Sequence, residues 1–163
     1  MKILSMKTTI FLGAMLSLLV CLMSTGCSNS ETNSTSRGLT DFAHIEEEYL
    51  ATIDSLNWPD GITLPDKLED EDTGASFQVG YGETRASYLW EYSWMKEWLD
   101  TYNTDPERAE KALEELEKAF DMPYMGIDRC DDATRNYLRE NIDKAKLGDP
   151  SGFTESIRAN YAN

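Results

Sequence analysis

Residues 106–120 read PERAEKALEELEKAF, and this stretch decides the fold class. Its apolar residues recur three or four positions apart, so they share one face of a helix. They are Ala109, Ala112, Leu113, Leu116, Ala119 and Phe120. Two signals can start the helix: Asp105 followed by Pro106, or a capping box of Thr104 with Glu107. The stretch is therefore predicted to be an amphipathic helix that buries one face.

Other stretches on both sides have the same apolar period and similar boundaries. The pattern predicts helices over 41–56, 83–102 and 132–147, and a short last helix after the Asp-Pro pair at 149–150. Thr40 or Asp41 can cap the first of them. Four to five amphipathic helices with short links are typical of a bundle. The fold class is accordingly predicted to be mainly α, a small bundle-like domain.

The segment 62–81 lacks the helical period. Residues 62–64 and 76–81 have the composition and alternation of extended chain, and the charged run 66–72 separates them. A structureless connection of this length is uncommon inside a compact domain. A short irregular or two-stranded β element is therefore expected around 62–81.

The predicted helix 83–102 is rich in aromatic residues. Trp90, Trp94 and Trp98 follow one another at spacings of four and form a stripe beside the polar face. Such a stripe either fills the core of a small domain or forms the edge of a ligand groove. If it is a groove edge, Trp90 lies nearest the polar face and is the ring expected to be exposed.

Glu91 is the unusual residue of the same helix, because its position falls among the aromatic side chains. A carboxyl group in such surroundings loses solvation, which raises its pKa and suits it to act as a general acid. The alternative is that an arginine, a tyrosine hydroxyl or a backbone amide from another element satisfies it. Glu91 and the three tryptophans are the candidate ligand surface.

The remaining motifs indicate no cofactor, metal ion or catalytic residue. His44, the only histidine, is expected to pair on the surface with Glu48, one turn away. A single histidine excludes multi-histidine metal sites, and no nucleophile-elbow sequence exists. The acidic run 66–72 is expected to be a solvated loop. The glycines of 80–82 lack the third glycine of a dinucleotide fingerprint, because Arg85 occupies that place.

Cys130 has no predicted disulfide partner. Aspartates flank it at 128, 131 and 132, so its thiol pKa should be raised and its nucleophilicity reduced. An inert, partly buried thiol is the main interpretation, and an intermolecular or redox role is the alternative.

The charge balance bounds the partners. The chain has 15 basic and 30 acidic residues, a formal net charge of −15. Residues 1–27 contain two lysines and no acid, so without them 13 basic residues stand against 30 acidic ones. Nucleic acid is therefore not an expected partner, since its binding requires cations that displace counterions from phosphate. Anionic headgroups would also repel this domain.

The N-terminus has the order of a secretory signal. Lys2 and Lys7 precede an apolar run over 10–23, and Ser-Thr-Gly at 24–26 precedes Cys27. The run has 14 residues, too few for a helix across a hydrocarbon core of about 30 Å. This stretch resembles the signal of bacterial lipoproteins. It departs from their usual pattern at Ser24, where leucine is common.

The resemblance covers only residues 1–27, and what it implies concerns location. It implies cleavage before Cys27 and a lipid on the Cys27 thiol. The domains expected are then a signal peptide at 1–26, a lipidated cysteine and flexible Ser/Asn/Thr-rich tether at 27–38, and one helical extracytoplasmic domain at 39–163. The place expected is the bacterial cell envelope: the outer face of the cytoplasmic membrane, or the outer membrane if the cell has one.

For the function, the residues favour a binding or accessory role in the envelope, with a small molecule or a protein as ligand. One alternative is an envelope hydrolase, which would need Glu91 to face a concave site beside a second acid. Another is a structural subunit of an envelope complex, which would expose a large apolar patch.

Overall fold

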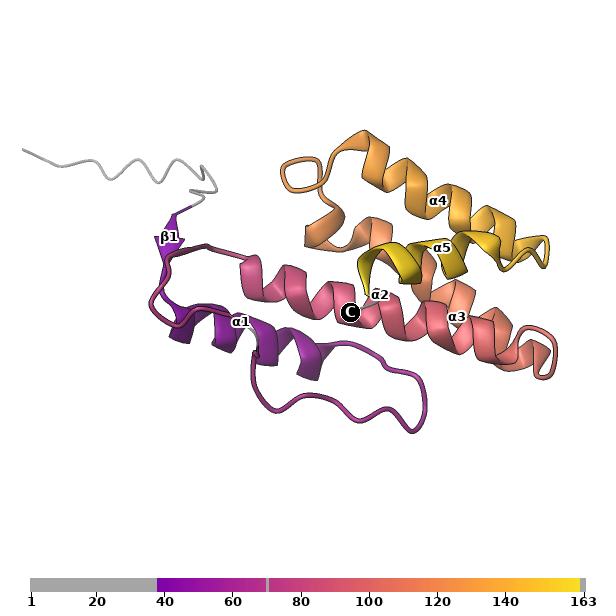
Figure 1. The fold of residues 1–163 in the computed structure, drawn as a ribbon, viewed down its shortest axis with the longest axis horizontal. Helices are drawn as coiled ribbons and strands as arrows, with labels where there is room; N and C mark the ends of the chain where they lie inside the picture. Colours follow the sequence, from indigo (N-terminus) through magenta and orange to yellow (C-terminus); the bar gives the residue numbers. More distant parts are fainter. Residues whose placement is uncertain (1–37, 70, 162–163) are drawn as a thin grey trace, which may run out of the picture. The chain divides into compact units, whose positions relative to one another are not determined.

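The computed structural model describes residues 38–69 and 71–161. In these residues the chain forms five α-helices, two short 3₁₀ helices and one two-stranded antiparallel sheet (Figure 1). The helices are α1 (Phe42–Ser55), α2 (Tyr81–Thr101), α3 (Pro106–Glu117), α4 (Asp132–Lys146) and α5 (Ser151–Asn160), with η1 (Lys118–Asp121) and η2 (Pro123–Met125) between α3 and α4. The predicted fold class, a small mainly α domain, is confirmed.

Three aspartates begin three of the helices. Asp41, Asp105 and Asp131 each accept a hydrogen bond from the backbone N–H three residues on, at 3.1, 3.2 and 2.7 Å. Such caps satisfy donors that have no partner within the helix. Of the two signals proposed for α3, the structure therefore uses Asp105.

The sheet differs from the expected one in its partner strand. β2 (Phe77–Gln78) lies in the predicted segment, but it pairs with β1 (Leu39–Thr40) and not with residues 62–64, which form no strand. The reason is the direction of the two helices that follow. α1 and α2 both begin beside the sheet and run the same way (Figure 1), so the ladder joins their two entries.

The start of α2 is held by α1. The carboxylate of Glu48 accepts hydrogen bonds from the backbone N–H groups of Gly80 at 2.8 Å and Gly82 at 3.2 Å. A Cβ on Gly82 would lie 1.8 Å from the Ile45 carbonyl oxygen, so only glycine permits this close approach. His44 pairs with Glu48 at 3.3 Å, as expected. The glycines of 80–82 thus form a helix entry, and a carboxylate occupies its positive end.

α2 separates two apolar clusters. On the α1 side, Ile45, Tyr49, Ile53, Leu68 and Ala86 are buried together. The larger cluster contains the three tryptophans of α2 and the apolar face of α3, where Leu116 is fully buried, and it includes side chains from α4 and α5. The apolar stripe predicted for 106–120 is therefore packed as the sequence indicated.

The predictions for the signal peptide, Cys27 and nearly all of the tether concern residues 1–37, which lie outside the described residues. Within the described ranges, no helix is both long and apolar enough to cross a membrane.

Candidate functional site

The three tryptophans of α2 are core residues. Trp90 and Trp94 are 1% exposed, and Trp98 is 2% exposed. The indole N–H groups of Trp90 and Trp94 both donate to the carbonyl oxygen of Asn57, at 2.8 and 3.2 Å. The groove-edge alternative, which required Trp90 to be exposed, is therefore wrong, because the chain that follows α1 covers this ring. The position of Trp90 around the predicted helix suggested exposure, but this position contains no information on segments from elsewhere in the chain.

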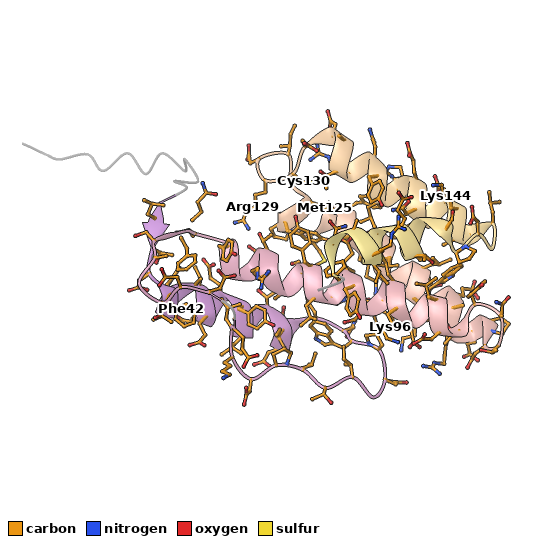
Figure 2. All side chains as sticks on the ribbon, viewed as in Figure 1. Phe42, Lys96, Met125, Arg129, Cys130 and Lys144 are labelled. Carbon is orange, nitrogen blue, oxygen red and sulfur yellow. The ribbon has the colours of Figure 1, made fainter. Side chains whose placement is uncertain are left out.

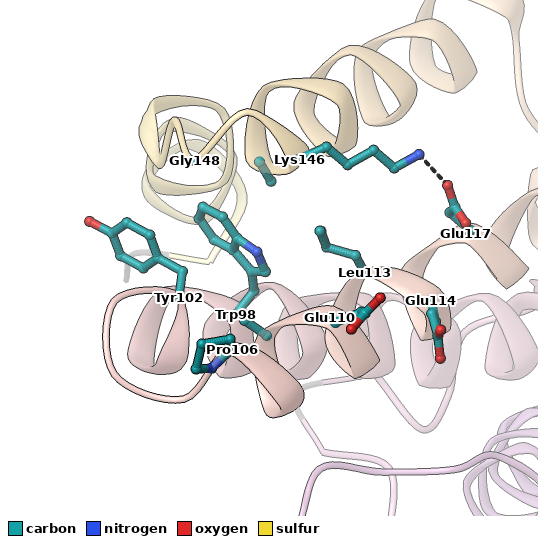
Figure 3. Close-up of a pocket in the computed structure, with 11 residues that line it drawn as sticks. Trp98, Tyr102, Pro106, Glu110, Leu113, Glu114, Glu117, Lys146 and Gly148 are labelled. Carbon is teal, nitrogen blue, oxygen red and sulfur yellow. Dashed lines mark hydrogen bonds and ion pairs between the residues drawn. The ribbon is translucent and has the colours of Figure 1, made fainter.

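Trp98 alone of the three lines a described pocket, which we call the Trp98 pocket. Its ring stacks on Tyr102 at 4.6 Å between centroids and meets Phe153 edge-on at 5.3 Å. The pocket encloses about 480 Å³ between α2, α3 and the end of α4 (Figure 3). Its wall contains Glu110, Glu114, Glu117 and Lys146, and the Lys146 ammonium pairs with Glu117. The tryptophans consequently do not form one ligand surface.

Glu91 is buried, with 8% of its surface exposed. The hydroxyl of Tyr124, from η2, donates a hydrogen bond to Glu91 Oε2 at 2.8 Å. Burial raises the pKa of Glu91 to about 7, although the bond from Tyr124 acts in the opposite direction. The predicted raised pKa is confirmed, and the partner is a tyrosine hydroxyl from another element. The carboxyl group therefore exchanges its proton near neutral pH.

Glu91 lines a pocket of about 330 Å³, which we call the Glu91 pocket. Side chains of α2, η2, α4 and α5 and the residue after α5 enclose it. Its lining residues are Arg85, Tyr88, Glu91, Met125, Thr134, Tyr137, Leu138, Ser156, Asn160 and Tyr161. A concave site with apolar walls and a few convergent polar groups is the usual form of a small-molecule site.

Tyrosines surround the carboxyl group. Tyr88 meets Tyr124 edge-on at 5.7 Å between ring centroids, and the Tyr161 hydroxyl donates to the Tyr88 carbonyl oxygen at 3.2 Å. Burial raises the pKa of the Tyr88, Tyr124 and Tyr161 hydroxyls, with Glu91 as a further cause. These hydroxyls therefore stay protonated and uncharged at neutral pH. Tyr88 and Tyr137 are each 41% exposed, so part of the pocket lining is in contact with solvent.

No cation neutralises Glu91 among the described residues, whose ion pairs do not include it. Arg85 also lines the pocket, but it pairs with Glu71 at 3.3 Å. Its Cα precedes that of Glu91 by six residues, a rise of about 9 Å along a helix. Glu91 is also the one carboxylic acid among the described lining residues. The second acid that a two-carboxylate hydrolase requires is not in this lining.

Sequence reasoning identified Glu91 but not its surroundings. Tyr124 belongs to the run 122–125, Met-Pro-Tyr-Met, which has no periodic signal and folds as a 3₁₀ turn. Tyr137 lies on the exposed side of α4, and Tyr161 follows the last helix. The only signal for Tyr124 was indirect: a carboxyl group placed among aromatics requires a hydrogen-bond donor from elsewhere.

Cys130 lies on the segment between η2 and α4, close to Met125 (Figure 2). Its sulfur is 3.5 Å from the Met125 sulfur, and the thiol is free. Burial is the main cause that raises its pKa, and Asp131 adds to the effect while Arg135 opposes it. The expected raised pKa is confirmed, with burial more important than the aspartates. Across the described residues, no group of three side chains is placed to hold a metal ion.

Comparison of the chain with protein-family models, with curated proteins and with solved structures finds no match. The function is therefore inferred from the site and from the sequence.

Proposed function

We propose that the protein is a lipid-anchored lipoprotein of the bacterial envelope whose helical domain binds a small ligand in the Glu91 pocket. The observation that carries the binding role is the position of Glu91: a buried carboxyl group that lines a pocket and has no cationic partner. Its hydrogen bond with Tyr124 uses Oε2. The described residues offer no second hydrogen bond to this carboxyl, so Oε1 is available to a ligand.

Among the described residues, one other glutamate is buried, and it gives a measure of how unusual Glu91 is. Glu115 is as buried as Glu91, but Lys118 pairs with it at 2.6 Å. Burying a charged group without a partner is unfavourable, so a buried charge with a purely structural role is normally paired. Glu91 therefore has the features of a group kept for a ligand, whereas Glu115 has those of a packed ion pair.

Binding is favoured over hydrolysis by the composition of the lining. A glycosidase-type mechanism uses two carboxyl groups on opposite sides of the substrate. The Glu91 pocket supplies one carboxyl group, and its other polar groups are the tyrosine hydroxyls, Ser156, Thr134, Asn160 and Arg85. These groups suit recognition, because they can fix the orientation of a ligand by hydrogen bonds. The lining lacks the two carboxyl groups that a glycosidase uses to transfer protons.

The anchor is supported by the N-terminal sequence. The cationic start, the apolar run over 10–23 and the small residues before Cys27 follow the order of a lipoprotein signal. Acyl chains on Cys27 would hold the domain at the membrane, since each buried CH₂ contributes about 0.8 kcal/mol. The Ser/Asn/Thr-rich residues 28–38 would then keep the acidic domain away from anionic headgroups.

A fragment screen with two blocking variants tests the binding role. Thr134→Trp places a large ring at the Glu91 pocket, and Glu110→Trp does the same at the Trp98 pocket; both positions are exposed, so the fold should tolerate them. Amide shifts of the full chain in neutral detergent are recorded with a fragment library. Hits abolished by Thr134→Trp and retained by Glu110→Trp support the proposal. Hits with the opposite pattern contradict it.

Metabolic labelling with a fatty acid tests the anchor. The wild-type chain and the Cys130→Ser variant should incorporate the label, and the Cys27→Ser variant should not. The Cys130→Ser variant is the matched control, since it also removes one thiol. Equal labelling of all three chains would end the claim that Cys27 is lipidated.

A further inference from the structure

The Glu91 pocket contains a carboxyl group for which the described residues offer no cation when it is charged. Glu91 shares the pocket lining with three tyrosines, and its one described hydrogen bond is accepted from the uncharged Tyr124 hydroxyl. The chain as a whole has a formal net charge of −15. Such a field attracts cations to the pocket and repels anions. A cation is thus the partner that would stabilise the charged form of Glu91.

The walls of the pocket fit the rest of such a ligand. Tyr88, Tyr137 and Tyr161 contribute rings to the lining, and the faces of aromatic rings attract cations within about 6 Å of the ring centroid. Met125 and Leu138 contribute apolar surface and are themselves buried. The volume of about 330 Å³ is at the small end of ligand pockets.

We propose that the Glu91 pocket binds a small organic ammonium ion, with the ammonium group on the Glu91 carboxylate and the apolar part among the tyrosine rings, Met125 and Leu138. This inference rests on the proposed function, that the pocket binds a small ligand. It adds the charge and the chemical class of that ligand.

The pocket discriminates against an anionic ligand. Arg85 is the one cation among the described lining residues, and it is exposed and paired with Glu71. An anion at Arg85 would compete with Glu71, and an anion deeper in the pocket would meet Glu91. A neutral ligand would leave the Glu91 carboxyl in its uncharged form, with no gain from its charge.

Binding of the cation should release a proton. With the pocket free, burial favours the neutral carboxyl, so the pKa of Glu91 is about 7. An ammonium ion stabilises the carboxylate, and the carboxyl proton leaves to solvent as the ion pair forms. The titratable groups that face Glu91 are Tyr88, Tyr124, Tyr161 and Cys130, whose pKa values are all raised. These four groups keep their protons near neutral pH, so the released proton comes from Glu91.

The test uses three probes of nearly equal size: n-butylammonium, n-butanol and n-butyrate. They share a four-carbon chain and differ in charge. A primary alkylammonium stays protonated near neutral pH, as a lysine side chain does with a pKa of about 10.4. Binding to the full chain is measured from amide shifts at about pH 8 and about pH 5.5. Butylammonium should bind tightest, and its affinity should fall by about tenfold or more at the lower pH.

Two variants with the same net charge separate the site from the general field. Glu91→Gln keeps the size of the side chain and its hydrogen bond from Tyr124, but removes the negative charge. Glu114→Gln removes one charge at an exposed position in the wall of the Trp98 pocket. Glu91→Gln should weaken butylammonium binding by about tenfold or more and abolish its pH dependence. Glu114→Gln should leave both unchanged.

The other outcomes each decide the question. If butanol binds as tightly as butylammonium and this binding is lost in Thr134→Trp, the ammonium inference is overturned and the binding role remains. Tighter binding of butyrate would have the same consequence. If butylammonium binding weakens equally in Glu91→Gln and Glu114→Gln, the cation is attracted only by the acidic surface in general. This result would overturn the assignment of the binding site to Glu91. If none of the three probes shifts the pocket amides, the ammonium inference fails, and the fragment screen decides the binding role separately.

Discussion

Helix α2 contributes to both the Trp98 pocket and the Glu91 pocket, but the two pockets differ in whether their acidic side chains are exposed to water. The Trp98 pocket has three glutamates in its wall, and one of them pairs with Lys146 near the surface. The Glu91 pocket has one glutamate, which is buried and has no cationic partner among the described residues. Exposed acids lower the stability of the fold little, because water solvates them. A buried acid without a cation is destabilising when charged.

This difference between exposed and buried acids indicates which of the two pockets is the better candidate for a binding site. The glutamates of the Trp98 pocket all lie on α3 and are exposed, as acids on the solvent side of an amphipathic helix usually are. A buried carboxyl group without a cation requires surroundings that keep it uncharged or a ligand that pairs with it. The Glu91 pocket is therefore the stronger candidate for function, although the Trp98 pocket is larger.

The largest expected effect tests whether Trp98 is core or ligand surface. Trp98→Ala should lower the free energy of unfolding by about 3–5 kcal/mol, because the ring is buried against Tyr102 and Phe153. Chemical denaturation of the full chain measures the loss. A loss below about 0.5 kcal/mol is typical of exposed positions. It would show that Trp98 is not a core residue and would contradict the comparison of the two pockets.

The next effect concerns the charge of Glu91. Its pKa is about 7 in the folded protein and 4.5 as an ordinary glutamate, so the folded state holds a proton that the unfolded state has released. The stability due to this proton is present below the ordinary pKa and is lost as the pH rises through 7. Glu91→Gln should therefore gain stability relative to wild type by about 2–3 kcal/mol between about pH 5 and about pH 8.

The matched control for this experiment is Glu114→Gln, whose carboxyl group is exposed. Its stability relative to wild type should stay constant within about 0.5 kcal/mol over the same pH range. Parallel pH profiles of the two variants would mean that Glu91 is solvated like Glu114, and the distinction between the two pockets would be lost.

A smaller effect is expected from the partner of Glu91. Tyr124→Phe removes the hydroxyl that donates to Oε2 and leaves the ring in place. Without this bond, which favours the charged form, the pKa of Glu91 should rise further, and stability at about pH 8 should fall by about 1–2 kcal/mol. Denaturation at two pH values measures the change. A loss that is equally large at about pH 5 would indicate lost packing instead of lost charge stabilisation.

The smallest effect belongs to the ion pair of the Trp98 pocket. Lys146→Met keeps most of the apolar stem and removes the charge that pairs with Glu117, and both side chains are about half exposed. Stability should change by less than about 0.5 kcal/mol, and added salt should reduce the difference. A loss above about 1 kcal/mol would show that this pair is not an ordinary surface pair.

The sequence predicted the helices well because each has a local signal. Asp41, Asp105 and Asp131 are capping residues whose bonds lie within three positions, and Leu116 repeats the apolar period around it. The strand partner was not predictable in the same way. β1 and β2 are almost forty residues apart, and only the packing of α1 on α2 brings them together.

The candidate site shows the same limit. The pKa direction of Glu91 followed from its neighbours along one helix, and the structure confirms it. The exposure of Trp90 did not follow, because the segment that covers it comes from the chain after α1. The tyrosines at 124, 137 and 161 come from three further elements, and no spacing in the sequence relates them to Glu91.

The central claim is that Glu91 is a buried carboxyl group without a cation, poised to lose its proton near neutral pH. A ¹³C NMR titration of the glutamate side-chain carboxyl carbons in the full chain measures this directly, with Glu91→Gln to assign the signal and Glu114 as an exposed reference. The Glu91 signal is expected to titrate with a pKa of about 7. A pKa near the ordinary 4.5 would mean that the carboxyl is solvated or neutralised, and would contradict the account.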